Sequence, residues 1–237
     1  MNDLIINRDP KSPISEAYRT LRTNIQFSSI DKEIRSIVVT SSGATEGKST
    51  TATNIAASFS QMGKKVVIID ADMRRPRLAK IYDLANKEGL STALFENDDI
   101  HKYVRKINGA HVVTSGPIPP NPAEMLSSDR MANAIDKLKE VYDYIIVDSP
   151  PVSYVTDGAI LSSICDGTLL VVAAGQTDQR QARVAKEQLN KVSANILGVV
   201  LTKIPTKGKG YYKYHYSNLY QYGETLKKGK KRKKKDK

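Results

Sequence analysis

The sequence predicts an α/β fold, a mostly parallel twisted sheet flanked by helices, and three observations support this. Short apolar runs rich in β-branched residues alternate with helical stretches along most of the chain, as in successive βα units. A glycine-containing loop that ends in GKST lies between the first of these runs and the helix that follows. The 237 residues, 40% of them hydrophobic, are enough for one large domain with a real core.

The first predicted element is an amphipathic helix over residues 14–30, where apolar residues recur at helical spacing behind two prolines. Apolar runs then predict six strands: IRSIVVTSS, KVVIIDAD, a short HVVTS, DYIIVDS, GTLLVVAA and NILGVVLTK. Among the helices predicted between them are KSTTATNIAASFSQMG, NPAEMLSSDRMANAIDKLKEVY and DQRQARVAKEQLNKVS. The order of the strands within the sheet does not follow from this pattern.

The same pattern divides the chain into three parts. Residues 1–33 form an N-terminal helical segment, residues 34–204 the α/β domain, and residues 205–237 a flexible tail without apolar periodicity. Of the net charge of +12, the last eleven residues carry +8, from nine basic residues and one aspartate. The globular part is therefore only mildly basic.

Composition excludes several classes of protein. The single cysteine, Cys165, excludes an internal disulfide and fits a reducing cytoplasm, and the three scattered histidines offer no metal cluster. No run approaches the roughly 18 to 20 apolar residues of a membrane-spanning helix, and no secretory h-region is present. We therefore expect a soluble protein, with contact to a membrane surface left open.

The loop SSGATEGKST, residues 41–50, has the context of a phosphate-binding loop between a strand and a helix. Its backbone N–H groups and the helix N-terminus favour phosphate, Lys48 can reach the β and γ phosphates, and Ser49 can ligate Mg²⁺. A glycine is usual where Ser42 stands, but Gly43 follows at once. The predicted nucleotide-binding residues are Ser42, Gly43, Ala44, Thr45, Glu46, Gly47, Lys48, Ser49 and Thr50.

Three aspartates end predicted strands. Asp70 and Asp72 close VVIIDAD, two residues apart and so on the same side of an extended chain, and Asp148 closes YIIVDS. Because ligands bind beyond the carboxyl ends of parallel strands, these side chains and the loop should meet. The sequence predicts a magnesium site made by Ser49, Asp70 and Asp148.

A tyrosine cluster marks the predicted tail. Half of the 12 tyrosines lie within twelve positions: Tyr211, Tyr212, Tyr214, Tyr216, Tyr220 and Tyr222. The run from Lys227 to Lys237 follows them.

Together these motifs resemble the bacterial tyrosine kinases that carry Walker motifs, the BY-kinases, whose fold is that of P-loop NTPases of the deviant-Walker, ParA/MinD-like kind. The resemblance is carried by the loop, VVIIDADMR, IIVDSPP, SGPIPPNPAEML and the tyrosine cluster, and it spans essentially the whole chain. EAYRTLR matches the family's E-x-x-R-x-x-R motif with Glu16, Arg19 and Arg22. The chain most resembles the separate cytoplasmic kinase of Gram-positive capsule or exopolysaccharide synthesis.

The resemblance implies roles for the predicted site. ATP and Mg²⁺ would be the cofactors, with Lys48, Asp70, Asp72 and Arg74 as catalytic residues. Asp72 would accept the tyrosine proton, since a phenol with a pKa of about 10 is protonated at neutral pH. Arg74 could stabilise the transferring group, hold Asp72 or be plain surface charge, and the sequence leaves this open.

The resemblance also implies partners. We expect the chain to form a homo-oligomer, which could be a ring, joined through Glu16, Arg19 and Arg22. In this assembly one copy would phosphorylate the tail tyrosines of its neighbour. A membrane-anchored activator of the polysaccharide co-polymerase type and a cognate tyrosine phosphatase are implied. The enzyme would lie at the inner face of the plasma membrane, where the lysine run can contact anionic lipid, and nucleic acid is not an expected partner.

Two other functions remain open from the sequence. One is a ParA/MinD-like positioning ATPase on membrane or DNA, although those proteins have a lysine where Gly43 stands here. The other is a non-enzymatic, nucleotide-gated adaptor whose tail binds nucleic acid or lipid through charge and stacking.

Overall fold

The computed structural model describes residues 4–28, 33–107 and 109–205. The chain divides into two units, Met1–Lys203 and Ile204–Lys237, and every helix and strand below lies in the first. The six tail tyrosines and the lysine run lie outside the described residues.

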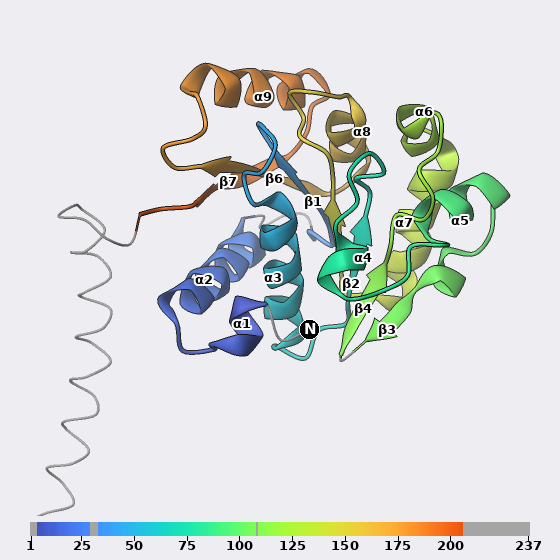
Figure 1. The fold of residues 1–237 in the computed structure, drawn as a ribbon, viewed down its shortest axis with the longest axis horizontal. Coiled ribbons are helices and arrows are strands. Elements are labelled where there is room, and N and C mark those ends of the chain that lie inside the picture. Colours follow the sequence, from blue (N-terminus) through green and yellow to red (C-terminus); the bar gives the residue numbers. More distant parts are fainter. Residues whose placement is uncertain (1–3, 29–32, 108, 206–237) are drawn as a thin grey trace, which may run out of the picture. The chain divides into compact units, whose positions relative to one another are not determined.

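The described residues form a seven-stranded sheet in the order β3-β4-β2-β5-β1-β6-β7 (Figure 1). All neighbouring strands are parallel except the edge pair β3 and β4, so the predicted fold class is confirmed. The strands are β1 Ser36–Ser41, β2 Val66–Asp70, β3 Arg105–Ile107, β4 Ala110–Val113, β5 Tyr144–Asp148, β6 Gly167–Ala173 and β7 Ile196–Thr202. The six predicted strands are present, and β3 is additional.

Helices cover both faces of the sheet. Successive strand residues face opposite ways, so an entirely apolar strand presents apolar side chains on both faces. In β1, Ile37 and Val39 pack in one core cluster and Val38 in the other. The first cluster contains residues of α1 Ile5–Arg8, α2 Pro13–Phe27, α3 Lys48–Ser60 and α4 Leu78–Ile81. The opposite face carries α5 Leu90–Glu96, a 3₁₀ helix Ile100–Tyr103, α6 Pro122–Leu126, α7 Asp129–Val141, α8 Asp157–Ile164 and α9 Gln179–Lys191.

The N-terminal helix α2 begins after Ser12, whose hydroxyl accepts the Ser15 N–H, with Pro13 in the first turn. The helix lies against α3, as Figure 1 shows, and contributes Ile25 to the core. The predicted apolar stripe is only partly buried, because Ile14 is 50% exposed. The helix prediction is confirmed, and both ends of its apolar face are open, since Phe27 at the last position of α2 is exposed as well.

The segment predicted as one helix over residues 121–142 is two helices, α6 and α7. The hydroxyls of Ser127 and Ser128 donate to the carbonyls of Glu124 and Met125, three residues earlier. Such local bonds compete with helical hydrogen bonding and favour a break.

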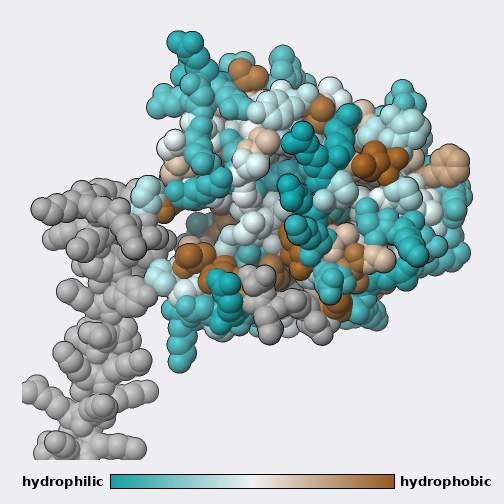
Figure 2. All heavy atoms as spheres, in the orientation of Figure 1, coloured by the Kyte–Doolittle hydropathy of each residue, from teal (hydrophilic) through white to brown (hydrophobic). Residues whose placement is uncertain are grey.

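The face in Figure 2 is mainly hydrophilic, with small and separate hydrophobic areas. Among the described residues, no helix is long and apolar enough to cross a membrane.

Candidate active site

The phosphate-loop candidate connects β1 to α3, and its backbone explains why the last glycine is needed. Gly47 has φ of 94° at the N-cap of α3, a left-handed conformation that side chains rarely adopt. Lys48 then begins the helix. The helix N-terminus therefore faces the loop, which favours an anion there.

Glu46 holds this loop in place. Its carboxylate is buried and accepts hydrogen bonds from the Ser42 hydroxyl at 2.8 Å, the Gly43 N–H at 2.8 Å and the Thr177 hydroxyl. The Thr202 hydroxyl donates to the Glu46 carbonyl at 2.6 Å. The loop is thus tied to residues at the carboxyl ends of β6 and β7, a bracing role that the loop motif alone does not indicate.

Lys48 reaches two of the predicted carboxylates. Its ammonium lies 2.8 Å from Asp72 Oδ2 and 3.3 Å from Asp148 Oδ1. Burial alone would lower the pKa of Lys48, but the charges of Asp148 and Asp72 outweigh it and the pKa is raised. Lys48 is therefore a buried, charged lysine between two acidic strand ends.

Asp70 and Asp148 are directly paired in the register of β2 and β5. Asp70 accepts backbone N–H bonds from Asp72, Arg77 and Leu78, which fixes the turn after β2. Burial, and then the charge of Asp148, raises the pKa of Asp70 to about 7. Burial also raises the pKa of Asp148.

A metal cation could be held in this cluster beside Asp148 and Ser49. Asp148 Oδ2 is buried and has no hydrogen-bond partner among the described residues. Ser49 Oγ lies 3.3 Å from the Lys48 ammonium, and a Ser49 hydrogen bond is among the contacts that oppose the rise in the pKa of Asp148, so this hydroxyl lies beside the Asp148 carboxyl. The described residues contain no group of three or more His, Cys, Asp or Glu side chains that could hold a metal alone. A cation here would need further ligands, such as phosphate and water oxygens.

Arg74 is held by a residue that the motifs did not indicate. Its Nε and Nη2 donate to the two carboxylate oxygens of Asp157 at 2.9 and 3.1 Å. Asp157 is fully buried in the first turn of α8. In the sequence Asp157 resembles an ordinary acidic residue at the start of a helix. No sequence motif therefore indicates that it contacts Arg74.

The three residues predicted for assembly lie on α2 in two different situations. Arg19 pairs with Glu16 within the helix at 2.5 Å. Arg22 donates to the Ser58 carbonyl of α3 at 2.8 Å, so its guanidinium already contacts its own subunit.

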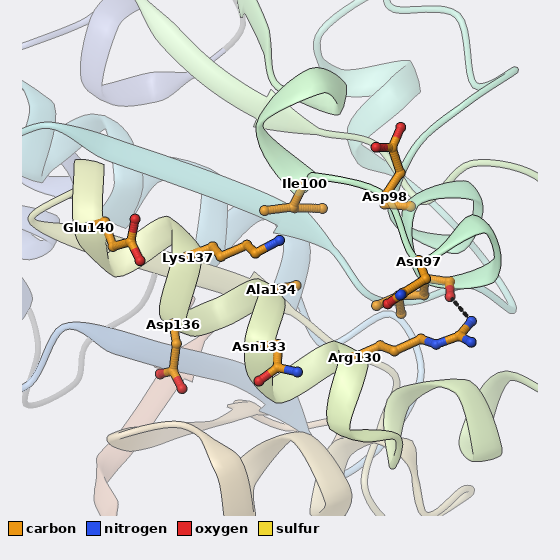
Figure 3. Close-up of a pocket in the computed structure, with 11 residues that line it drawn as sticks. Asn97, Asp98, Ile100, Arg130, Asn133, Ala134, Asp136, Lys137 and Glu140 are labelled. Carbon is orange, nitrogen blue, oxygen red and sulfur yellow. Dashed lines mark hydrogen bonds between the residues drawn. The ribbon is translucent and has the colours of Figure 1, made fainter.

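A cavity of about 460 Å³ lies apart from these residues, between the segment Ala93–Ile100 and α7 (Figure 3). Arg130, Lys137, Glu140 and Asp98 are among its lining residues. None of the predicted site residues that the structure describes lines this cavity, and the phosphate-loop site lies at the carboxyl ends of β1, β2 and β5.

The strand, loop and helix, with acidic residues at neighbouring parallel strand ends, define a P-loop nucleotide-binding protein. A family model described as an AAA domain matches residues 34–182.

Comparisons with known proteins narrow the class. The chain is 44% identical over 201 residues to the tyrosine-protein kinase YwqD of Bacillus subtilis, covering 84% of this chain and 85% of the relative. It is 38% identical over 192 residues to the tyrosine-protein kinase CpsD of Streptococcus agalactiae, covering 80% and 83%. The crystal structure of the chimerical protein CapA2B2 aligns with a TM-score of 0.82 and 39% identity, over 87% of this chain and 92% of that one. The chain belongs to the bacterial tyrosine-protein kinase family, and it is an ATP-dependent enzyme of that class.

Proposed function

We propose that this enzyme transfers the γ-phosphate of ATP to tyrosines, including the C-terminal cluster of a neighbouring copy, and so regulates capsule or exopolysaccharide synthesis. The observation that carries the proposal is the buried Lys48 ammonium, which joins the phosphate loop to Asp72 and Asp148. Phosphoryl transfer needs mainly position and charge neutralisation, and this arrangement can supply both.

The loop and the acidic residues divide the work. The N–H groups of residues 43–50 and the Lys48 ammonium would hold the phosphates. To reach them, the Lys48 ammonium must break its contact with at least one of its two carboxylate partners. Ser49 and Asp148 would hold Mg²⁺, and Asp70 would act through water because three backbone N–H groups already occupy its carboxylate. When bound, Mg²⁺ supplies neutralisation of phosphate charge.

Asp72 is the proposed acceptor of the tyrosine proton. In the part of the chain that the structure describes, its Oδ2 bonds only to the Lys48 ammonium, while Oδ1 accepts the Arg75 N–H at 3.0 Å. A shift of Lys48 toward phosphate would therefore expose Oδ2 to an incoming phenol. Arg74, fixed by Asp157, would set the turn that carries Asp72.

The assembly and partners belong to the same proposal. Residues 1–33 would serve assembly through Glu16, Arg19 and Arg22, residues 34–204 would be the kinase domain, and residues 205–237 would be the acceptor tail. A membrane-anchored activator would hold the enzyme at the inner face of the plasma membrane, and the chimerical nature of the CapA2B2 relative agrees with a two-component arrangement. A tyrosine phosphatase would reverse the reaction, and the lysine run would contact anionic lipid.

A ParA/MinD-like function loses support because those loops carry a lysine where this chain has Gly43. In this structure the Gln181 side chain occupies the space beside Gly43, with its amide 2.9 Å from where a Cβ would be. Membership in the tyrosine-kinase family likewise disfavours a non-enzymatic adaptor.

Intact-mass spectrometry after incubation with Mg-ATP tests the proposal, with and without the cytoplasmic segment of the activator. Wild-type protein should gain phosphates, Lys48→Met alone should gain none, and a variant with the six tail tyrosines changed to Phe should lose most of them. Lys102→Met, a change at an exposed lysine, is the matched control and should behave as wild type. Phosphates on isolated Lys48→Met would contradict the proposal.

A further inference from the structure

Tyr154 differs from the other tyrosines that the structure describes. The described residues contain six tyrosines: Tyr18, Tyr82, Tyr103, Tyr142, Tyr144 and Tyr154. Five are buried or half-buried, whereas Tyr154 is 62% exposed. A tyrosine can be a kinase substrate only if its hydroxyl can enter another active site, and exposure of this degree meets that condition.

Tyr154 lies beside the phosphate loop. It follows Asp148 on the connection from β5 to α8, which is fixed by the Val152 N–H donating to the Ser41 carbonyl at 2.9 Å. The Gln181 amide lies 3.2 Å from the Tyr154 hydroxyl and donates to the Ser42 carbonyl at 3.1 Å. The hydroxyl is therefore two hydrogen bonds from the loop backbone.

We propose that Tyr154 is a phosphoacceptor of this kinase, modified by a second copy, and that its phosphorylation weakens nucleotide binding. The proposal rests on the tyrosine-kinase function above. The phenol oxygen bonds to the γ-phosphorus of ATP, the bond to the β–γ bridging oxygen breaks, ADP leaves, and the phenolic proton passes to the donor copy's Asp72.

Transfer between copies follows from the contacts of the hydroxyl. Within the described residues it bonds to Gln181 on α9, and neither Lys48 nor Asp72 is a partner. Transfer within one molecule would require the β5–α8 connection to leave its place, whereas a second copy meets an exposed side chain.

The effect on nucleotide follows from charge. A phosphotyrosine carries about −1.5 to −2 at neutral pH. Placed near Ser42 and Gly43, this charge repels the phosphates that the loop would bind, and it competes for the Gln181 amide. Modification of Tyr154 thus acts as negative feedback on the enzyme.

Phosphopeptide mapping of the full chain after incubation with Mg-ATP tests the site. The variant with six tail tyrosines changed to Phe should still carry phosphate on the Tyr154 peptide, and adding Tyr154→Phe should remove it. Tyr144→Phe, a half-buried tyrosine whose ring stacks on Phe59, is the matched control and should keep the Tyr154 phosphate. Lys48→Met protein should gain phosphate on Tyr154 only when wild-type enzyme is added. An unmodified Tyr154 peptide beside a phosphorylated tail would overturn this inference alone, whereas no phosphotyrosine anywhere would overturn the proposed function.

Calorimetric titration with MgADP tests the feedback. The tail variant phosphorylated on Tyr154 should bind about tenfold more weakly than the same protein after phosphatase treatment. Equal affinity of the two forms would refute the feedback.

Discussion

Replacing Lys48 by Met removes a buried positive charge and leaves its acidic partners behind. In the wild-type protein the ammonium lies within 3.3 Å of both Asp72 and Asp148, and Asp148 is fully buried. Removing one member of a buried ion pair costs about 3–5 kcal/mol, because the remaining charge stays without compensation. We expect Lys48→Met to lower the free energy of unfolding by about this amount near pH 8.

The loss should shrink in acid. Asp70 already has a pKa raised to about 7, mainly by burial and then by the charge of Asp148, and the pKa of Asp148 is raised by burial. Without Lys48, the pKa values of these carboxyls rise further in the folded state. The unfolded chain then binds fewer protons than the folded chain from about pH 4 to above pH 7, so stability falls as pH rises through that window. At about pH 5.5 the carboxyls take up protons, and much of the cost is relieved.

Urea unfolding followed by circular dichroism at both pH values measures this. Lys102→Met is the control, since that lysine is exposed and pairs with Asp98 four residues earlier at the surface. A Lys48→Met protein as stable as wild type near pH 8, or one that loses more stability in acid, would refute the electrostatic account of Lys48.

Three further changes test separately the support of the phosphate loop by Glu46, the positioning of Arg74 by Asp157, and the assembly of subunits through α2. Glu46→Gln should weaken MgADP binding about tenfold in calorimetric titration, because the charged acceptor for the Gly43 N–H is lost; unchanged affinity would show that the brace is dispensable. Asp157→Asn should lower kcat about tenfold with little change in the KM for ATP, since it frees Arg74 without touching the loop; a selective rise in KM would contradict this role. Arg22→Ala should lower the unfolding free energy by about 1–2 kcal/mol, whereas Glu16→Ala with Arg19→Ala should mainly reduce assembly in analytical ultracentrifugation; equal effects on stability would argue against this division.

The parts of the fold that follow local patterns could be predicted from the sequence. The six apolar strands and the loop-to-helix junction are examples, and Asp70 and Asp148 were expected to lie near each other because each ends a parallel strand. The strand β3 was missed because Arg105–Ile107 is short and mostly polar, so it forms only by pairing with β4. The break between α6 and α7 was missed because local serine hydrogen bonds override a continuous helical pattern.

Contacts between distant segments explain the rest. Glu46 is braced by Thr177 and Thr202, which are 131 and 156 residues away in the chain. Asp157 meets Arg74 across 83 residues. Neither pair has a spacing signal, since the meeting depends on the order of strands, which the alternation of strands and helices leaves open.

The charges at the strand ends give a reason for a divalent cation in the proposed mechanism. Asp72 and Asp148 both pair with the Lys48 ammonium, Asp70 adds its charge from beside Asp148, and the nearby Arg74 is already paired with Asp157. Bringing ATP phosphates to this point would add negative charge to an acidic cluster. If Lys48 turns to the phosphates, Asp148 loses a partner, and its other oxygen has none among the described residues. A cation bound between Asp148 and phosphate would compensate both groups at once, so nucleotide binding and metal binding should each strengthen the other.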